Sequence, residues 1–401
     1  MSLMENLNEN FKIIGNGHKI NNFPRINSID FLKGVSICII ILINTAEMWM
    51  DNESRHIYAL IYVYFDVIGT SLFIFLYSIS VIFLWKRKMG ITPSKAIRND
   101  ILTRGFTFIT LGLIYNIITT SIIQNVIFPY NIWGWNILIF IGFAQIISYY
   151  TLKLSRGTRW ILGFLVFFAS TPIRDLLIIF KYSFPIGTIL HFIIISPNPQ
   201  VTILPYIGLC FFSTIFGERI LECLQLDAKK CNTDAFRAFI GFGAMFLAIG
   251  IYFGFGPVTS EILDPEDFPM VNLFPLLKGS PYFPFSGIPG FFIRGTAPNL
   301  LYGLGASLII LGVSFYFLDT LHIHNSIVRL FNVYGRGSLS LVFIHCIGLF
   351  FFYHQLNLIV FLVIYFIYVG LLGFLMYLWI KYAKDIGTLK WLISKVGSRH
   401  K

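Results

Sequence analysis

The stretch Arg25–Lys88 organises the chain: it opens RINSIDFLKGVSICIIILINT and, after a polar loop ending in SRH, continues YALIYVYFDVIGTSLFIFLYSISVIFLWKRK. Each apolar run is about 20 residues or longer, the length that an α-helix needs to cross ~30 Å of hydrocarbon. The stretch therefore predicts two membrane-spanning helices joined by a short loop. Three polar residues, Asn44, His56 and Asp66, lie within or between these helices, where polar side chains are costly.

The composition of the whole chain indicates the same class. Its 401 residues are 56% hydrophobic and only 12% charged, with a mean hydropathy of +0.75, whereas a soluble domain has about 25% charged residues. We expect an all-α polytopic integral membrane protein, because helices satisfy their own backbone hydrogen bonds in lipid. Hydropathy predicts about ten transmembrane helices, at residues 31–50, 58–85, 101–122, 132–152, 160–180, 201–221, 236–256, 297–318, 337–353 and 356–380.

The net charge of +11 is explained by membrane topology and does not call for a nucleic-acid partner. Of the 30 Lys and Arg residues, the outer loops hold only Arg55, Arg174, Lys181, Lys278 and Arg294. Because basic residues gather on the inner side of a membrane, both termini are predicted to be cytoplasmic.

This topology divides the chain into three parts. We expect a cytoplasmic N-terminal tail at 1–24, a transmembrane domain at 25–385 with a long outer loop at 257–293, and a basic cytoplasmic tail at 386–401. Residues 171–200 fit either a loop packed on the outer end of the fifth span or a re-entrant segment. The five cysteines lie in spans or on the inner side without a C-x-x-C pair, so neither a disulfide framework nor a zinc site is predicted.

Depth along the helices relates the three polar residues of the opening stretch. Asn44 lies about six residues, or ~9 Å, below the outer end of its helix, and Asp66 about eight residues, or ~12 Å, below the end of the next. They are therefore predicted to lie at similar depth, with His56 at the mouth above them. If residues 56–66 form one helix, His56 and Asp66 are ~15 Å apart and do not share a hydrogen bond.

Each of these residues also has a purely structural interpretation. Asp66 can pair with another helix, Asn44 can bond to one, and His56 can simply be solvated in its loop. Function is favoured for Asp66 because acids inside a membrane are rare and costly, and a histidine can take and give a proton near neutral pH. A fourth polar residue, His345, lies alone in a late span, and we expect it to be structural.

The motif R-x-x-S-x-D-x-x-K-G at residues 25–34, followed by Asn44, His56 and Asp66, resembles the heparan-α-glucosaminide N-acetyltransferase family of transmembrane acyltransferases. The family pattern has Arg-Gly where this chain has Lys33-Gly34. Three later segments, WNILIFIGFAQIISYY, LPYIGLCFFSTIFGE and YGRGSLSLVFIHC, are similar to signatures of the family's later helices.

The resemblance implies transfer of an acetyl or other short acyl group from cytoplasmic acyl-CoA to an amine or hydroxyl of an extracytoplasmic acceptor, expected to be a sugar. It implies that His56 carries the proton or the acyl group, that Asn44 binds the thioester carbonyl or the acceptor, and that Asp66 holds an amine or a nearby donor. No metal is expected. The coenzyme A phosphates are predicted to meet the inner basic residues Lys33, Lys86, Arg87 and Arg104, although topology alone also demands basic inner loops.

A multi-pass transporter or flippase of a small polar or lipid-linked molecule is the alternative. Such a protein is expected to have interrupted helices in matching halves and several charges deep in the membrane, whereas here the deep charge is nearly confined to Asp66. The predicted partners are the lipid bilayer, acyl-CoA and the acceptor, a homodimer remains open, and the predicted location is the cell membrane.

Overall fold

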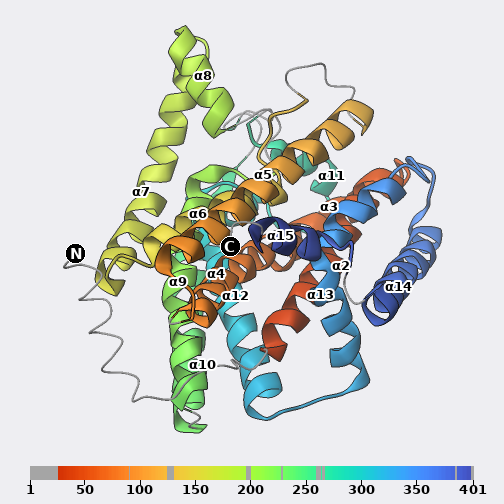
Figure 1. Ribbon diagram of the computed structural model, residues 1–401. Helices are drawn as coiled ribbons and strands as arrows, with labels where there is room; N and C mark the ends of the chain where they lie inside the picture. The colour runs from red at the N-terminus through yellow and green to blue at the C-terminus, as the bar shows by residue number, and fades with distance from the viewer. Residues whose placement is uncertain are drawn as a thin grey trace.

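Helices form almost the whole of the part of the chain that the computed structural model describes, residues 26–89, 91–123, 131–195, 200–226, 229–258, 263, 267–383 and 386–398 (Figure 1). The elements are α2 Asn27–Trp49, α3 Arg55–Asp66, the π-helix η1 Val67–Ser71, α4 Leu72–Lys88, α5 Ser94–Ile123, α6 Ile137–Thr151, α7 Arg156–Phe180, α8 Pro185–Ile194, α9 Ile203–Leu226, α10 Lys229–Gly254, β1 Pro257–Val258, η2 Pro269–Leu273, α11 Phe274–Leu277, β2 Ile288–Pro289, η3 Gly290–Phe292, α12 Ala297–Phe315, the π-helix η4 Tyr316–Thr320, α13 Ser326–Gly348, α14 Leu358–Ala383 and α15 Leu389–Ser398.

The prediction of an all-α polytopic membrane protein is confirmed. In the described ranges, eight helices are long and apolar enough to cross a membrane: Asn27–Trp49, Arg55–Lys88, Ser94–Thr119, Arg156–Phe180, Cys231–Gly254, Ala297–Thr320, Ser326–Gly348 and Leu358–Ala383. Every segment predicted to span falls on a helix, but α6 is shorter than a span and α9 is not among these eight. The number of crossings and the side of the termini therefore stay predictions.

The glycine of the opening motif allows α2 and α13 to pack backbone against backbone. A Cβ atom on Gly34 would lie 2.0 Å from the carbonyl oxygen of Phe331, and one on Gly335 would lie 1.8 Å from that of Asp30. Small residues are what lets two helices approach this closely in a membrane. This contact holds the late YGRGSLSLVFIHC segment against the first span.

The start of α2 is capped by a residue from far along the chain. The backbone N–H groups of Asn27 and Ser28 donate to the two carboxylate oxygens of Asp319, at 2.7 and 3.0 Å. The first N–H groups of a helix have no partner within it and favour negative charge. Asp319 thus fixes the position of the N-terminus of α2 against η4.

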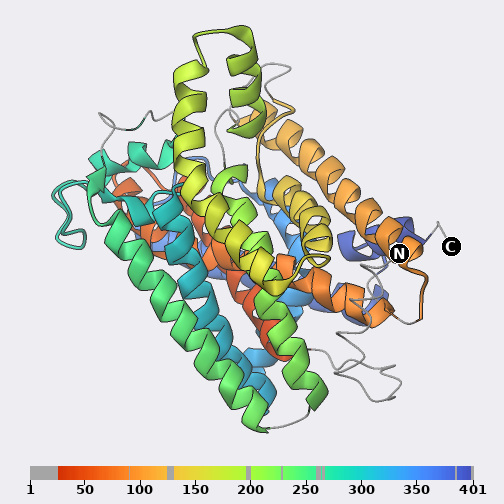
Figure 2. The same ribbon diagram turned by 90° about the vertical axis from the view of Figure 1, so that its left-hand side faces the viewer.

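Residues 171–200 include the end of a helical hairpin. Helix α7 continues through Pro172 to Phe180, and α8 then turns back beside it. The hairpin projects from one end of the molecule, while α10 and α12 run side by side elsewhere (Figure 2). A hydrogen bond of 2.6 Å from the Thr188 hydroxyl to the Lys181 carbonyl closes the turn.

The predicted outer loop at 257–293 packs onto the helices where it is described. Strands β1 and β2 pair antiparallel near its two ends, and the side chains of Phe283, Phe291 and Phe292 between or beside them are buried. The predicted N-terminal tail at 1–24 lies outside the described residues. Within the predicted C-terminal tail, α15 forms and packs against α5.

The prediction that no cysteines pair was wrong. Cys223 near the end of α9 and Cys231 near the start of α10 form a disulfide, with their Cα atoms 5.2 Å apart. The two helices turn back on each other here, so residues eight apart in sequence meet. No sequence spacing rule marks this pair.

Candidate active site

A cavity of about 500 Å³ opens among the helix ends beneath the loop that follows α10. This size is typical of small-molecule sites. Its walls are formed by residues of the loop and by parts of several helices: the C-terminal half of α2, the start of α3, the second half of α5, the start of α6 and the end of α13. Its polar lining consists of Asn44, Glu47, Arg55, Tyr58, Tyr62, Thr70, Tyr115, Thr119, Asn136, Gln200, Thr202, Asp267, Asn272, Arg294 and His345.

Asn44 and His345 form a hydrogen-bonded pair in the wall of this cavity. The amide nitrogen Nδ2 of Asn44 lies 3.0 Å from Nε2 of His345, and the other ring nitrogen, Nδ1, lies 2.9 Å from the carbonyl oxygen of Leu341. Because a carbonyl only accepts, Nδ1 carries the hydrogen and Nε2 accepts from Asn44. The pair depends on the close contact of α2 with α13, since the residues are 301 positions apart.

Asp66 forms a buried ion pair with Arg294. Nε of Arg294 donates to Oδ2 of Asp66 at 3.0 Å, Nη2 donates to Oδ1, and the Thr70 hydroxyl donates to Oδ1 at 2.9 Å. Burial lowers the pKa of Arg294, but the charge of Asp66 outweighs it and holds that pKa above its usual value. Arg294 and Thr70 line the cavity, whereas Asp66 lies behind them in the wall.

His56 lies outside the cavity. Its ring is exposed, and Nδ1 donates to the carbonyl oxygen of Glu53 at 2.9 Å. Residues Arg55–Asp66 form one continuous helix, so His56 and Asp66 are ~15 Å apart along its axis and do not meet. Of the three predicted catalytic residues, Asn44 therefore lines the cavity, Asp66 supports its wall, and His56 does not line it but directly follows the cavity-lining Arg55 in the chain.

Comparison of the sequence with models of protein families gives a match. The model of the catalytic domain described as "Heparan-alpha-glucosaminide N-acetyltransferase, catalytic" matches residues 25–257, more than half of the chain. The chain belongs to the heparan-α-glucosaminide N-acetyltransferase family. No protein with curated annotation matches it.

Membership of this family confirms the predicted resemblance and makes the chain an integral membrane protein of the transmembrane acetyltransferase type. Acetyltransferases of this type use acetyl-CoA as the donor. The matched region contains Asn44, His56 and Asp66, whereas Arg294 and His345 lie beyond its end.

The residues of this chain that were predicted to bind coenzyme A do not line the cavity. Lys33 is buried, with Nζ 2.7 Å from the Ser80 hydroxyl and 4.0 Å from the centre of the Tyr77 ring. Arg104 forms an ion pair with Asp100 at 3.1 Å. Two further predicted residues lie at the end of α4, where Lys86 is half-buried and Arg87 is exposed.

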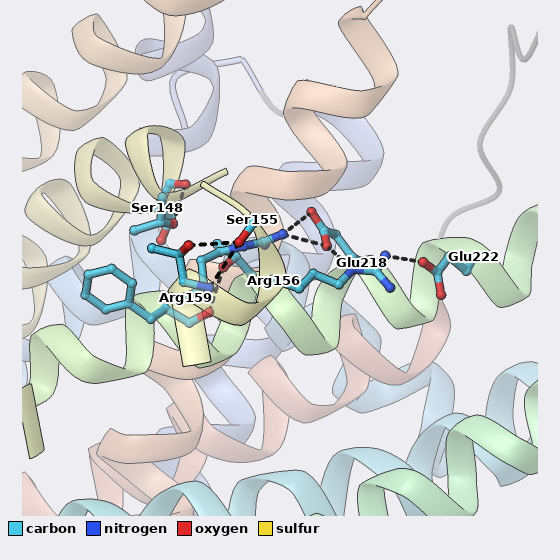
Figure 3. Close-up of polar contacts among 10 residues, drawn as sticks. Ser148, Ser155, Arg156, Arg159, Glu218 and Glu222 are labelled. Carbon is cyan, nitrogen blue, oxygen red and sulfur yellow. Dashed lines mark hydrogen bonds and ion pairs between the residues drawn. The ribbon is translucent and has the colours of Figure 1, made fainter. Parts of the chain in front are cut away.

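A second ionic cluster joins the N-terminal end of α7 to α9, with Arg159 and Glu218 buried and Arg156 exposed (Figure 3). Nη2 of Arg159 donates to both carboxylate oxygens of Glu218 at 2.9 and 2.8 Å, and Arg156 contacts Glu218 at 2.9 Å and also Glu222. Glu218 ends the LPYIGLCFFSTIFGE segment. Because an unpaired charge there would be costly, the cluster is best explained as a structural clamp between two helices.

The sequence did not lead us to predict a role at the site for several residues that line the cavity. His345 was expected to be structural, and Glu47, Arg55 and Arg294 were given no role at the site. Two signals were present. A carboxylate at Asp66 demands a buried cation, and Glu47 follows Asn44 by three positions, which places both on one helix face.

Proposed function

We propose that this protein transfers an acetyl or other short acyl group from cytoplasmic acyl-CoA to a hydroxyl or amine of an extracytoplasmic acceptor. The observation that carries the proposal is the Asn44–His345 pair inside a cavity of substrate size. Asn44 belongs to the family region, and the two residues supply an oxyanion donor and a base side by side. The alternative of a transporter gains no comparable support, because the family is one of transferases.

Asn44 would stabilise the negative charge that develops on the thioester carbonyl. Its Nδ2 carries two hydrogens, and only one is used by His345. The second can be donated to the carbonyl oxygen as it becomes an oxyanion. Removing one such donor typically costs about 10²–10³ in rate.

His345 would take the proton of the acceptor. The acceptor's O–H or N–H group first replaces Asn44 as the hydrogen-bond donor to Nε2, whose single lone pair the Asn44 amide otherwise occupies. The O–H or N–H bond then breaks as the acceptor's own lone pair attacks the thioester carbon, and Nε2 receives the proton. The tetrahedral intermediate then collapses, the C–S bond breaks, and the coenzyme A sulfur leaves with the proton returned by the imidazolium. Rotation of the Asn44 amide by half a turn presents its oxygen to a protonated Nε2, so the pair can hold either state.

His56 stays a candidate for the same task because it directly follows Arg55, which lines the cavity. For it to reach the acceptor, the segment at 51–54 must turn its exposed ring inward when substrate binds. Asp66 would act indirectly, since it fixes Arg294 in the cavity wall. The geometry of the described residues favours His345 as the base.

The donor would reach this site from the inner face. Lys33, Lys86, Arg87 and Arg104 are proposed to meet the coenzyme A phosphates there. Lys33 lies seven residues, about 10 Å along α2, from Ile40 in the cavity wall. An extended pantetheine arm is long enough to bridge this gap. The cell membrane as location and a sugar as acceptor belong to the same proposal.

Paired histidine variants test the assignment of the base. We expect His345→Ala to reduce acetyl transfer by about 10²–10⁴-fold, the usual contribution of a general base. His56→Ala is compared with it, and His324→Ala, which removes an exposed histidine far along the chain, is the control. Labelled acetyl-CoA and pooled glycoside acceptors in lipid nanodiscs give the readout.

The outcomes separate the assignments. Loss in His56→Ala with activity kept in His345→Ala assigns the base to His56. Full activity in both variants contradicts both assignments. If the unsubstituted protein labels no acceptor in any pool and leaves acetyl-CoA intact, the proposed function itself is wrong.

A further inference from the structure

Two buried side chains of the cavity lining each have one oxygen atom without a hydrogen-bond partner among the described residues. Asp267 and Thr202 are buried, at 2% and 4% exposure, and both line the cavity. Oδ1 of Asp267 is hydrogen-bonded to Nε2 of His191 at 2.8 Å and lies 3.8 Å from Nζ of Lys181. Oδ2 of Asp267 and the hydroxyl of Thr202, in contrast, have no hydrogen-bond partner among the described residues. Buried polar atoms are normally satisfied by protein, water or a ligand, so these two atoms are available to hydrogen-bond a ligand in the cavity.

Glu47 is a carboxylate that faces the same space. It lies one helical turn beyond Asn44 on α2 and lines the cavity. The positive charges of Arg55 and Arg294 both act on it, yet among the residues that the structure describes it forms no ion pair within 4.0 Å. Its oxygens are therefore available as hydrogen-bond acceptors.

The two arginines differ in what they can offer a ligand. Arg294 is already committed, because it donates to Asp66, Thr70 and the carbonyl of Gln200. Arg55 is not, since its buried Nε–H has no partner in the described part of the chain. One free acceptor group, Glu47, thus stands near one free donor group, Arg55, and their charges balance.

This balance discriminates between classes of acceptor. An ammonium group only donates hydrogen bonds, and a sulfate or carboxylate only accepts them, whereas a hydroxyl does both. A charged acceptor would satisfy one of the two free groups and be repelled by the other. An uncharged sugar can donate hydroxyl hydrogens to Glu47 and Asp267 and accept from Arg55, and the Tyr58 and Tyr62 rings of the lining give its apolar face a surface to rest on.

We propose that Glu47, Arg55 and Asp267 form the acceptor subsite of this cavity and that the subsite selects an uncharged, hydroxyl-bearing sugar, so that the reaction is O-acylation. The inference rests on the proposed acyl transfer and narrows its acceptor. Glu47 acts as a specificity-determining residue one turn from Asn44. It places a hydroxyl at the level where the thioester carbonyl is held.

Direct binding tests the subsite without turnover. The probes are the matched methyl glycosides of glucose, glucosamine and glucuronic acid, titrated calorimetrically into the full chain in lipid nanodiscs. Glycoside detergents are avoided, because they carry hydroxyl-rich headgroups themselves. We expect the neutral glucoside to bind best, and Glu47→Gln to weaken its binding about 10- to 100-fold, as expected for loss of a hydrogen bond to a charged group.

The control is Glu53→Gln, which removes the charge of an exposed glutamate in the loop after α2 and leaves the backbone carbonyl that holds His56. It should bind the glucoside as the unsubstituted protein does. In turnover assays, Glu47→Gln should raise the acceptor KM and leave the acetyl-CoA KM unchanged.

Preferred binding of the glucosaminide or the glucuronide, or no binding of any of the three, overturns the proposed subsite. So does unchanged glucoside binding in Glu47→Gln. These results are distinct from failure of the proposed function, in which the glucoside binds as expected but no acetyl-CoA is consumed.

Discussion

At the scale of single residues, Asp66 and Arg294 show how an acid is kept inside a membrane. Asp66 is 3% exposed, and an isolated carboxylate there would be strongly disfavoured. The guanidinium of Arg294 and the hydroxyl of Thr70 supply its hydrogen bonds. The pair also holds the Arg294 side chain in the cavity wall.

Breaking this pair from one side should be costly. Arg294→Gln leaves the Asp66 carboxylate buried without its cation, so we expect a loss of about 3–5 kcal/mol in stability. The double variant Asp66→Asn/Arg294→Gln should recover part of that loss, because no uncompensated charge remains. Thermal unfolding in detergent measures both, with Lys278→Gln, a change at an exposed residue of the predicted outer loop, as control. Additive losses in the double variant would show that the two side chains are not coupled.

Sequence analysis could locate candidate residues but not their partners. The depth of Asn44 and Asp66 follows from counting along two neighbouring helices, and the structure indeed places Asn44 in the cavity and Asp66 in its wall. Their partners, His345 and Arg294, are 301 and 228 positions away. No local period relates such positions, because their meeting depends on how α2, α12 and α13 pack. His56 was singled out from a family pattern, and its part in catalysis stays a prediction.

At the scale of elements, the sequence correctly predicted that its long apolar runs form helices, because a run of about 20 apolar residues can cross a membrane only in a structure that satisfies its own backbone hydrogen bonds. The details that depend on tertiary packing were not predicted. Helix α7 continues through Pro172, since neighbouring elements support its last turns, and α8 returns beside it. The π-helix η1 interrupts the regular bonding of the second span directly after Asp66, as such turns often do at functional sites.

The crossing of α2 and α13 is a feature of these elements that one methyl group should disrupt. We expect Gly34→Ala to destabilise the protein and to abolish acetyl transfer, because its Cβ would lie 2.0 Å from the Phe331 carbonyl oxygen, and separating the helices pulls His345 from Asn44. The matched control is Gly241→Ala on α10, whose Cβ would meet nothing within 4 Å. It should be neutral or stabilising by about 0.5–1 kcal/mol, the usual effect of replacing a helical glycine. Unfolding temperature and transfer rate are both measured, and equal behaviour of the two variants would contradict the proposed crossing.

At the scale of the whole molecule, the charge pattern predicts that the cavity and the basic residues proposed to bind coenzyme A lie at different levels of the membrane. The cavity is lined by the C-terminal half of α2 and by Arg294, which the charge pattern assigns to the outer side. The same pattern assigns Lys33, Lys86, Arg87 and Arg104 to the inner side. Moving the phosphates of coenzyme A through hydrocarbon is prohibitively costly. The donor is therefore expected to stay anchored inside while only its uncharged pantetheine arm reaches towards Asn44.

This separation predicts sidedness of the reaction. In sealed proteoliposomes with the cytoplasmic face inside, we expect labelled acetyl groups to reach an external glycoside only when acetyl-CoA is enclosed in the lumen. Orientation is fixed independently by labelling single cysteines placed at Ser280, in the predicted outer loop, and at Ser398, in the predicted inner tail, in a background whose other cysteines are replaced. Permeabilising the vesicles should restore activity with donor added outside, which controls for inactive protein. Equal transfer with donor supplied only outside intact vesicles would contradict the cross-membrane path, because the phosphates would then bind on the same side as the acceptor. The basic residues at the inner face would in that case have no part in holding the donor, and their positions would reflect membrane insertion alone.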